Sequence, residues 1–267
     1  MSTQTSEVQD TEQEENIEYS AWEEWDPRDY NREYYSEITL DGLYLMEWIV
    51  ECVQKAPHVD VALEFGSGPT VLHTFPLISK AKEIHLAEYL QVNREEVQRW
   101  VNKEPDTHDW SQFAREFLRL EGNQDPTDAE AEARQEQVRQ AITQVMPADA
   151  GEENPLGVDK RGFYPLVTAL CCADSATNDK DTWRLYMKNI ASLVKPGGML
   201  VISACGGHEF YRVGERRFPG ACVSGRDMLN CLQELGFGDI DLRLRQVPDS
   251  AGQGFSTTIL ARAIKPE

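Results

Sequence analysis

Short apolar runs alternate with helical patterns along most of this sequence, and this alternation restricts the fold more than any single residue does. Parallel strands covered on both faces are near-continuous apolar runs, and each is joined to the next by a crossover, usually a helix. Strands are expected at residues 59–65, 83–89, 117–120, 163–172, 199–205, 240–247 and 256–264. Helices are expected at residues 43–53, 71–78, 92–101, 127–146, 181–193 and 224–235, and a hairpin at 210–218. The pattern predicts an α/β fold with a mostly parallel sheet and helices on both faces.

The last two expected strands are separated only by residues 248–255. A parallel pair needs a long crossover, so these two strands are expected to pair antiparallel. The sequence therefore predicts a seven-stranded sheet with an antiparallel C-terminal strand. A dinucleotide-binding sheet would be expected to keep a crossover helix at this point.

Glu64-Phe65-Gly66-Ser67-Gly68 follows the first expected strand and precedes a helical pattern. Glycines at such a turn let a ligand approach the backbone, and a helix start offers free N–H groups. The loop matches GxG but not GxGxxG, because Val71 stands at the third glycine position. By itself the loop is compatible with nucleoside binding, dinucleotide binding or a plain tight turn.

Two carboxylates narrow these alternatives. Glu88 ends the second expected strand, about 20 residues after Gly66, where an acid can bind the ribose hydroxyls of an adenosine. Glu64 precedes the glycines, where an anion would repel a pyrophosphate. It suits the methionine end of S-adenosylmethionine (SAM), which carries a sulfonium and an ammonium but no phosphate. The pair favours SAM over NAD as the cofactor, with no metal.

The chain has a net charge of −20, which argues against nucleic acid as a partner because phosphate binding needs Lys and Arg. Residues 1–37 hold 12 acidic and 2 basic residues, and residues 121–160 hold 10 and 3. Residues 1–20 are acidic with almost no apolar content, which predicts a disordered leader. Met1–Glu18 lacks the basic and apolar segments of a signal peptide.

No apolar run approaches the ~18 residues of a membrane span. The six cysteines show no CxxC spacing and lie scattered in apolar segments. Reduced thiols, a cytoplasmic location and no membrane partner are therefore expected.

An aromatic group follows the acidic leader: Trp22, Trp25, Tyr30, Tyr34 and Tyr35. It is either a helix packed on the domain or a lid over a ligand. Residues 21–57 are expected to form N-terminal lid or cap helices, and residues 21–267 a single domain.

Six sets of residues occur in the order of a known family: Asp26–Tyr30 with Tyr34-Tyr35, Phe65–Thr70, Lys103–Pro105 with Asp109-Trp110, Leu120–Asn123, Asn154–Leu156 and Val213–Glu215. They resemble the nicotinamide/phenylethanolamine/indolethylamine/thioether N-methyltransferase family, which belongs to the class I SAM-dependent methyltransferases. The Lys195-Pro196-Gly197-Gly198 turn agrees with this resemblance. The resemblance implies a Rossmann-like sheet and SAM-dependent methyl transfer to a small molecule.

The resemblance also implies a role for single residues. Tyr30 would close over cofactor and acceptor, and Tyr35 would bond the carboxylate end of the cofactor. Asp149 and Ala150 would hold the adenine, and Leu170 would pack near the transferred methyl group. The remaining implied cofactor contacts are Glu64, Gly66, Ser67, Gly68, Thr70, Glu88, Tyr89 and Asn93.

The acceptor side departs from the best-known members. Nicotinamide-methylating relatives carry an Asp at the position of Ala204 and Ser at the positions of His208 and Gly220, so nicotinamide is not the expected acceptor. Tyr211 matches a pocket tyrosine. The expected substrate contacts are Tyr30, Cys171, Ala204, His208, Glu209 and Tyr211, and the candidate catalytic residues are His208, Tyr30 and Asp174.

The expected reaction is in-line N-methylation of a small amine, guanidine or nitrogen heterocycle by a monomeric enzyme. A protonated amine has no lone pair, so His208, Asp174 or Glu209 would accept its proton. Methylation of a thiol, thioether or selenide is the first alternative, and it needs no base when the acceptor is a thioether. An inactive SAM-binding interaction protein is the second. An NAD-linked oxidoreductase is weakened by Val71 and by the adjacent final strands.

Overall fold

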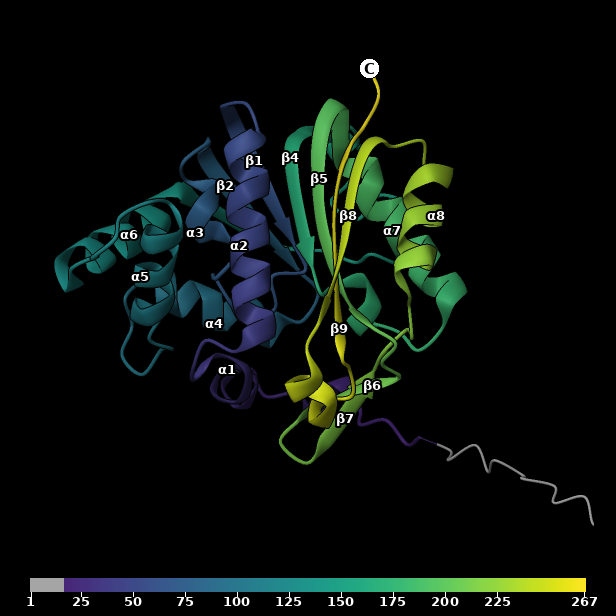
Figure 1. The fold of residues 1–267 in the computed structure, drawn as a ribbon, viewed down its shortest axis with the longest axis horizontal. Helices are drawn as coiled ribbons and strands as arrows, with labels where there is room; N and C mark the ends of the chain where they lie inside the picture. Colours follow the sequence, from purple (N-terminus) through teal and green to yellow (C-terminus); the bar gives the residue numbers. More distant parts are fainter. Residues whose placement is uncertain (1–16) are drawn as a thin grey trace, which may run out of the picture.

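The apolar runs form one seven-stranded sheet in the computed structural model, which describes residues 17–267 (Figure 1). Of the acidic leader expected at residues 1–20, residues 1–16 lie outside the described residues. The strands are β1 (Val59–Phe65), β2 (Ala81–Glu88), β3 (Ile142–Pro147), β4 (Tyr164–Leu170), β5 (Val194–Gly206), β6 (Phe210–Val213), β7 (Arg216–Pro219), β8 (Gly238–Gln246) and β9 (Thr257–Ile264). The α-helices are α1 (Pro27–Tyr35), α2 (Leu40–Lys55), α3 (Thr74–Leu77), α4 (Gln91–Val101), α5 (Ser111–Leu120), α6 (Asp128–Ala141), α7 (Lys180–Leu193) and α8 (Gly225–Glu234). Short 3₁₀ helices lie at Trp22–Glu24, Val158–Lys160, Ala173–Ser175 and Pro248–Gln253.

The strand order is β3-β2-β1-β4-β5-β9-β8. The pairs from β3 to β5 are parallel, and β9 runs antiparallel to both β5 and β8. The prediction of a mostly parallel sheet with an antiparallel C-terminal strand is confirmed. The carboxyl ends of β1, β2, β4 and β5 therefore meet at one edge of the sheet, where ligands of such folds bind.

Two apolar cores cover the two faces of the sheet, because successive strand residues point to opposite sides. Along β1, Ala62 packs with α2, α4 and α5, whereas Leu63 and Phe65 pack with α7 and α8. Neighbouring strands keep the same alternation, so helices lie on both faces (Figure 1).

The predictions for two elements were wrong. Residues 117–120, predicted as a strand, are the last turn of α5, whose buried Phe113, Ala114 and Phe117 follow helical spacing. Residues 127–146, predicted as one helix, divide into α6 and the edge strand β3, which pairs with β2. The β-branched Ile142, Thr143 and Val145 favour a strand at this point. The helix expected at 71–78 is also short, since only α3 is helical there.

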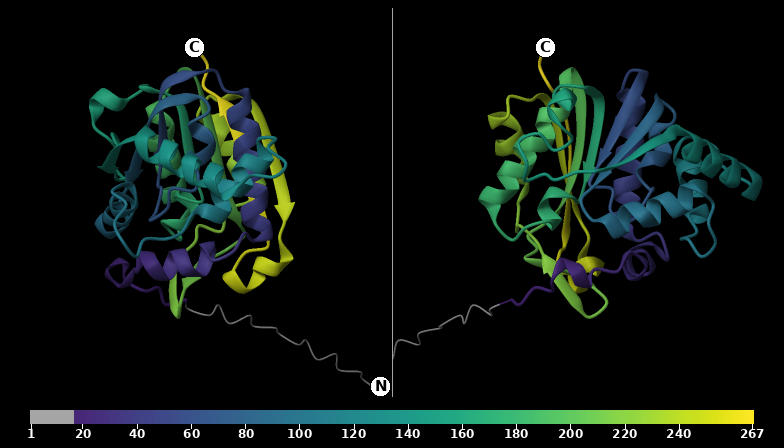
Figure 2. Two further views of the ribbon diagram at one scale, coloured as in Figure 1. Left: turned by 90° about the vertical axis from the view of Figure 1, so that its left-hand side faces the viewer. Right: turned by 180° about the vertical axis from the view of Figure 1, so that it is seen from behind.

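Helix α1 lies at the ligand edge, and α2 reaches it through its N-terminal residues Asp41, Gly42 and Leu45. Helix α2 buries Met46, Trp48 and Ile49 in a core of the sheet. Helix α1 and the hairpin β6–β7 lie together beyond the carboxyl edge of the sheet in all three ribbon views (Figures 1 and 2). Gly214 donates its N–H to Glu33 Oε2 at 2.5 Å, and the Tyr34 hydroxyl donates to the Arg212 carbonyl at 2.8 Å.

Within residues 17–267, no helix combines the length and apolarity that crossing a bilayer requires. The six cysteines are free thiols.

Candidate active site

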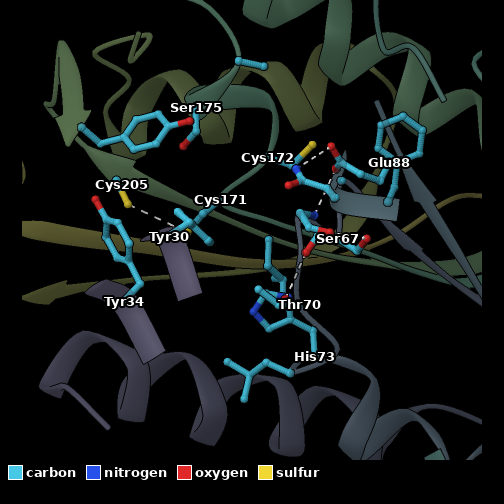
Figure 3. Close-up of a pocket in the computed structure, with 18 of the residues that line it drawn as sticks. Tyr30, Tyr34, Ser67, Thr70, His73, Glu88, Cys171, Cys172, Ser175 and Cys205 are labelled. Atoms are coloured by element: carbon cyan, nitrogen blue, oxygen red, sulfur yellow. Dashed lines mark hydrogen bonds between the residues drawn. The ribbon is translucent and has the colours of Figure 1, made fainter. Parts of the chain in front are cut away.

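A cavity of about 480 Å³ lies at the carboxyl edge of the sheet (Figure 3). The ends of β1, β2, β4 and β5 form its floor, and α1 with the β6–β7 hairpin covers it. Its size is within the range of small-molecule and cofactor sites. Of the residues expected in the site, it is lined by Tyr30, Tyr35, Gly66, Ser67, Gly68, Thr70, Glu88, Tyr89, Asn93, Asp149, Ala150, Leu170, Cys171, His208 and Tyr211.

The glycine loop is shaped by two backbone requirements. Gly66 and Gly68 have φ of +71° and +59°, a region that side chains disfavour. A Cβ on Gly66 would also collide with Cys172, approaching its Cβ to 2.6 Å, whereas one on Gly68 meets nothing within 4 Å. Gly66 is thus required by packing, and Gly68 leaves open space in the cavity.

Glu88 is buried and organises the loop beside it. Its Oε1 accepts from the N–H of Leu90 at 2.8 Å and from Asn93 Nδ2 at 3.0 Å, and its Oε2 accepts from the N–H of Gly68 at 3.0 Å. Burial raises the pKa of Glu88, and these hydrogen bonds oppose the shift. A carboxylate has about four acceptor positions. The three hydrogen bonds occupy three of them, so about one remains free for a ligand hydroxyl. The sequence predicted that Glu88 could bind two.

The aromatic lid, residues 22–35, is connected to Glu88 by hydrogen bonds through Asn93. Trp25 Nε1 donates to Asn93 Oδ1 at 2.7 Å, and both residues are buried. Trp25 also packs on Tyr30 and Phe218, with ring centroids 5.0 Å apart in each pair. The expected aromatic group therefore covers the cavity as a lid, in contact with the β6–β7 hairpin.

Replacing Trp25 by Phe should lower the free energy of unfolding by about 1–3 kcal/mol, because the buried Asn93 Oδ1 loses its donor. Urea unfolding measures this change. Trp22→Phe is the matched control, since Trp22 stacks on Phe218 at 5.1 Å and has no such bond to Asn93. Equal losses in both variants would contradict the role given to the Trp25–Asn93 hydrogen bond.

Asp149, Ala150 and Tyr89 line another part of the cavity. Asp149 Oδ1 accepts from the Gly151 N–H at 2.7 Å, and the Ala150 carbonyl accepts from Asn189 at 2.8 Å. These bonds hold the segment after β3 in place. Tyr89 is 62% exposed although it lines the cavity, so its ring is available to cover a ligand.

His208 lies on the opposite side of the cavity, after β5. Its Nδ1 donates to the Cys205 carbonyl at 2.7 Å. A carbonyl can only accept, so the neutral ring carries its lone pair on Nε2, which has no partner among the described atoms. A Cβ on Gly220 would lie 2.6 Å from that Nε2. The imidazole thus occupies space that a side chain at position 220 would need.

Replacing Gly220 by Ala should lower the free energy of unfolding by about 1–3 kcal/mol, because the added methyl group overpacks against His208. Thermal or urea unfolding would show the loss. Gly238→Ala is the control, because a Cβ there meets nothing within 4 Å. A second change, His208→Ala, should restore part of the stability. If Gly220→Ala is as stable as Gly238→Ala, the space near His208 is less tight than described.

Asp174, a candidate catalytic residue, lies behind the cavity wall. It is buried, does not line the cavity, and accepts from the Cys205 N–H at 2.9 Å. Burial raises the pKa of Asp174, and the nearby His208 opposes the shift. Asp174 would therefore make no direct contact with a ligand in the cavity.

Three other expected contacts do not line the cavity. Ala204 is buried in the core beside α7 and α8 because it faces away from the cavity, and Glu209 is exposed beyond the edge of the sheet. Glu64 is buried beneath the cavity, bonded to His73 Nδ1 at 2.8 Å and to the hydroxyl of Thr168.

His73 does line the cavity, as do Asp41, Phe255 and Cys172, none of which the sequence predicted. They come from segments whose proximity follows only from the fold.

The cavity lining is acidic. Among the described residues, the lining includes the carboxylates Glu37, Asp41, Glu88 and Asp149 but no Lys or Arg. The rest is largely aromatic and small. Such a wall favours a cationic or neutral ligand over an anionic one. In residues 17–267, no group of three His, Cys, Asp or Glu side chains is arranged to hold a metal ion.

Comparison with known proteins gives concordant matches. Residues 13–258 match the NNMT/PNMT/TEMT family. Human nicotinamide N-methyltransferase is 29% identical, with 80% of this chain and 82% of that protein covered. Indolethylamine N-methyltransferase from Oryctolagus cuniculus is 30% identical (79% and 81%), and human phenylethanolamine N-methyltransferase is 27% identical (86% and 83%).

Solved structures agree on the fold. A SAM-dependent methyltransferase from Methanosarcina mazei superposes with a TM-score of 0.55 at 10% identity, covering 80% of this chain and 95% of that one. The CurJ carbon methyltransferase gives 0.55 at 13% identity, covering 92% and 62%.

Proposed function

Because this chain belongs to the NNMT/PNMT/TEMT family of SAM-dependent small-molecule methyltransferases, we propose that its cavity binds SAM along the glycine loop and transfers the methyl group to a nitrogen of a small amine. The proposal rests on the cavity lining. Among the described residues, this lining contains carboxylates and aromatic rings but no Lys or Arg. That wall suits a sulfonium cofactor and a basic acceptor together.

The residues present fit this cofactor. Glu88 has about one acceptor position left for a ribose hydroxyl, and Gly68 leaves the backbone open to a ligand. Asp149 and Ala150 would hold the adenine, Ser67 and Thr70 would lie along the methionine portion, and Tyr30 and Tyr35 would close over it. Bound SAM supplies an already activated methyl group, so the chain has to align the acceptor and exclude water.

The acceptor would lie between the lid and the end of β5. Tyr30, Tyr34, Tyr211 and Cys171 line this part of the cavity. Its aromatic rings favour a cationic amine by cation–π attraction. The imidazole of His208 would take the proton that the amine must lose, once its Nε2, which lies buried beside Gly220, turns toward the acceptor. Asp174, buried behind Cys205, would act only as a positioning residue.

A screen with methyl-labelled SAM over amines, guanidines, pyridines, thiols and selenides tests this proposal. Labelling of a nitrogen compound is expected, and labelling of thiols or selenides alone would contradict it. If the protein binds S-adenosylhomocysteine (SAH) but labels no acceptor, it is an inactive SAM-binding protein.

We further propose that residues 21–267 act as one monomeric domain in the cytoplasm. The six free thiols are consistent with a reducing compartment. Sedimentation of the purified protein tests the oligomeric state.

A further inference from the structure

His73 and Glu64 form a buried pair beneath the glycine loop. Their side chains are only 8% and 1% exposed, and Nδ1 lies 2.8 Å from Glu64 Oε1. The hydroxyl of Thr168, from β4, donates to the other carboxylate oxygen. Glu64 is thus held from both sides and cannot reach the cavity itself. No Lys or Arg is paired with Glu64 in the described chain.

The pair determines which ring nitrogen of His73 carries the lone pair. A carboxylate accepts, so Nδ1 carries the proton and the neutral ring has its lone pair on Nε2. Nε2 is buried and has no partner among the described atoms, and His73 lines the cavity. The ring therefore holds an unused acceptor within the cavity wall, with a negative charge directly behind it.

The position of His73 determines which part of the cofactor it would contact. Figure 3 shows Ser67 and Thr70 between Glu88 and His73 along the glycine loop. If Glu88 holds the ribose, as proposed above, then the amino-acid end of the cofactor lies toward His73. That end carries an ammonium and a carboxylate, and a lone pair backed by a carboxylate suits the ammonium.

We propose that His73 binds the α-ammonium group of the cofactor through Nε2 and that Glu64 acts through His73 rather than by direct contact. The inference rests on the proposed binding of SAM in this cavity. Arrival of the ammonium would supply the cation that the buried Glu64 carboxylate lacks. His73 is thereby a cofactor-binding residue, and Glu64 is its positioning residue.

Calorimetric titration with three probes tests this inference: SAH, its analogue without the α-amino group, and its analogue without the carboxylate. His73→Ala should weaken SAH and the decarboxylated analogue about ten- to a hundredfold, the range of a charge-assisted hydrogen bond. Binding of the deaminated analogue should be unchanged, which also shows that the variant is folded. Glu64→Gln should give the same selectivity.

The control is His85→Ala. His85 is a buried histidine outside the cavity, bonded to the Tyr164 hydroxyl at 2.9 Å, and its loss should leave the ratios among the three probes unchanged. The inference is overturned if His73→Ala weakens all three probes equally, or if it spares the decarboxylated analogue. Wild-type protein that binds none of the probes would instead refute the proposed function.

Discussion

Gly66→Ala is expected to lower the free energy of unfolding by about 2–5 kcal/mol and to abolish cofactor binding. A left-handed backbone costs a residue with a Cβ about 1–2 kcal/mol. Overpacking against Cys172 adds about 1–3 kcal/mol. Denaturant unfolding measures the first effect, and titration with SAH measures the second.

Gly68→Ala separates the two causes of that loss. Gly68 has nearly the same positive φ, but a Cβ there meets nothing within 4 Å, so only the backbone cost of about 1–2 kcal/mol is expected. In the Gly66→Ala background, Cys172→Gly should recover the steric part. Equal destabilisation by the two glycine substitutions would mean that Cys172 does not restrict position 66.

His208→Ala should lower kcat for an amine about 10²- to 10⁴-fold, the usual contribution of a general base. Its effect on the affinity for SAH should be small, because His208 lies across the cavity from the glycine loop. Steady-state kinetics with a saturating amine and a separate SAH titration distinguish the two effects. His58, which is exposed, provides the control substitution His58→Ala.

His208→Gln tests whether chemistry or volume matters at this position. Glutamine fills much of the same space but cannot accept a proton, so it should be as slow as Ala. Full activity of the Gln variant would show that His208 only shapes the pocket. An unchanged rate in His208→Ala would favour a thioether as the acceptor, since its methylation needs no base.

Much of the proposed cofactor side of the cavity could be predicted because it is encoded locally. A GxG turn after a strand, with an acid at the end of the next strand, places Gly66, Gly68 and Glu88 together in any parallel sheet of this kind. The structure brings Gly68 and Asn93 within hydrogen-bond distance of Glu88. The aromatic group of residues 22–35 was also evident from its clustering, although clustering alone left core packing and a lid as alternatives.

The proposed acceptor side was harder to predict because its residues follow strands through irregular loops. Ala204 and Glu209 flank the correct region, yet the pleat of β5 turns one into the core and the loop turns the other to solvent. His208 alone of these three lines the cavity. Its contact with Gly220 joins two segments through the β6–β7 hairpin, which no local pattern specifies.

By itself, then, the sequence determined most of the strand and helix alternation, the antiparallel final pair and the glycine loop with Glu88, since each depends on local spacing and connection length. Tertiary structure alone decided the boundary between α6 and β3, where pairing with β2 outweighed helical spacing. It also decided that Glu64 reaches the cavity only through His73. Strand register and packing set which buried groups touch, and these depend on contacts between residues far apart in the chain.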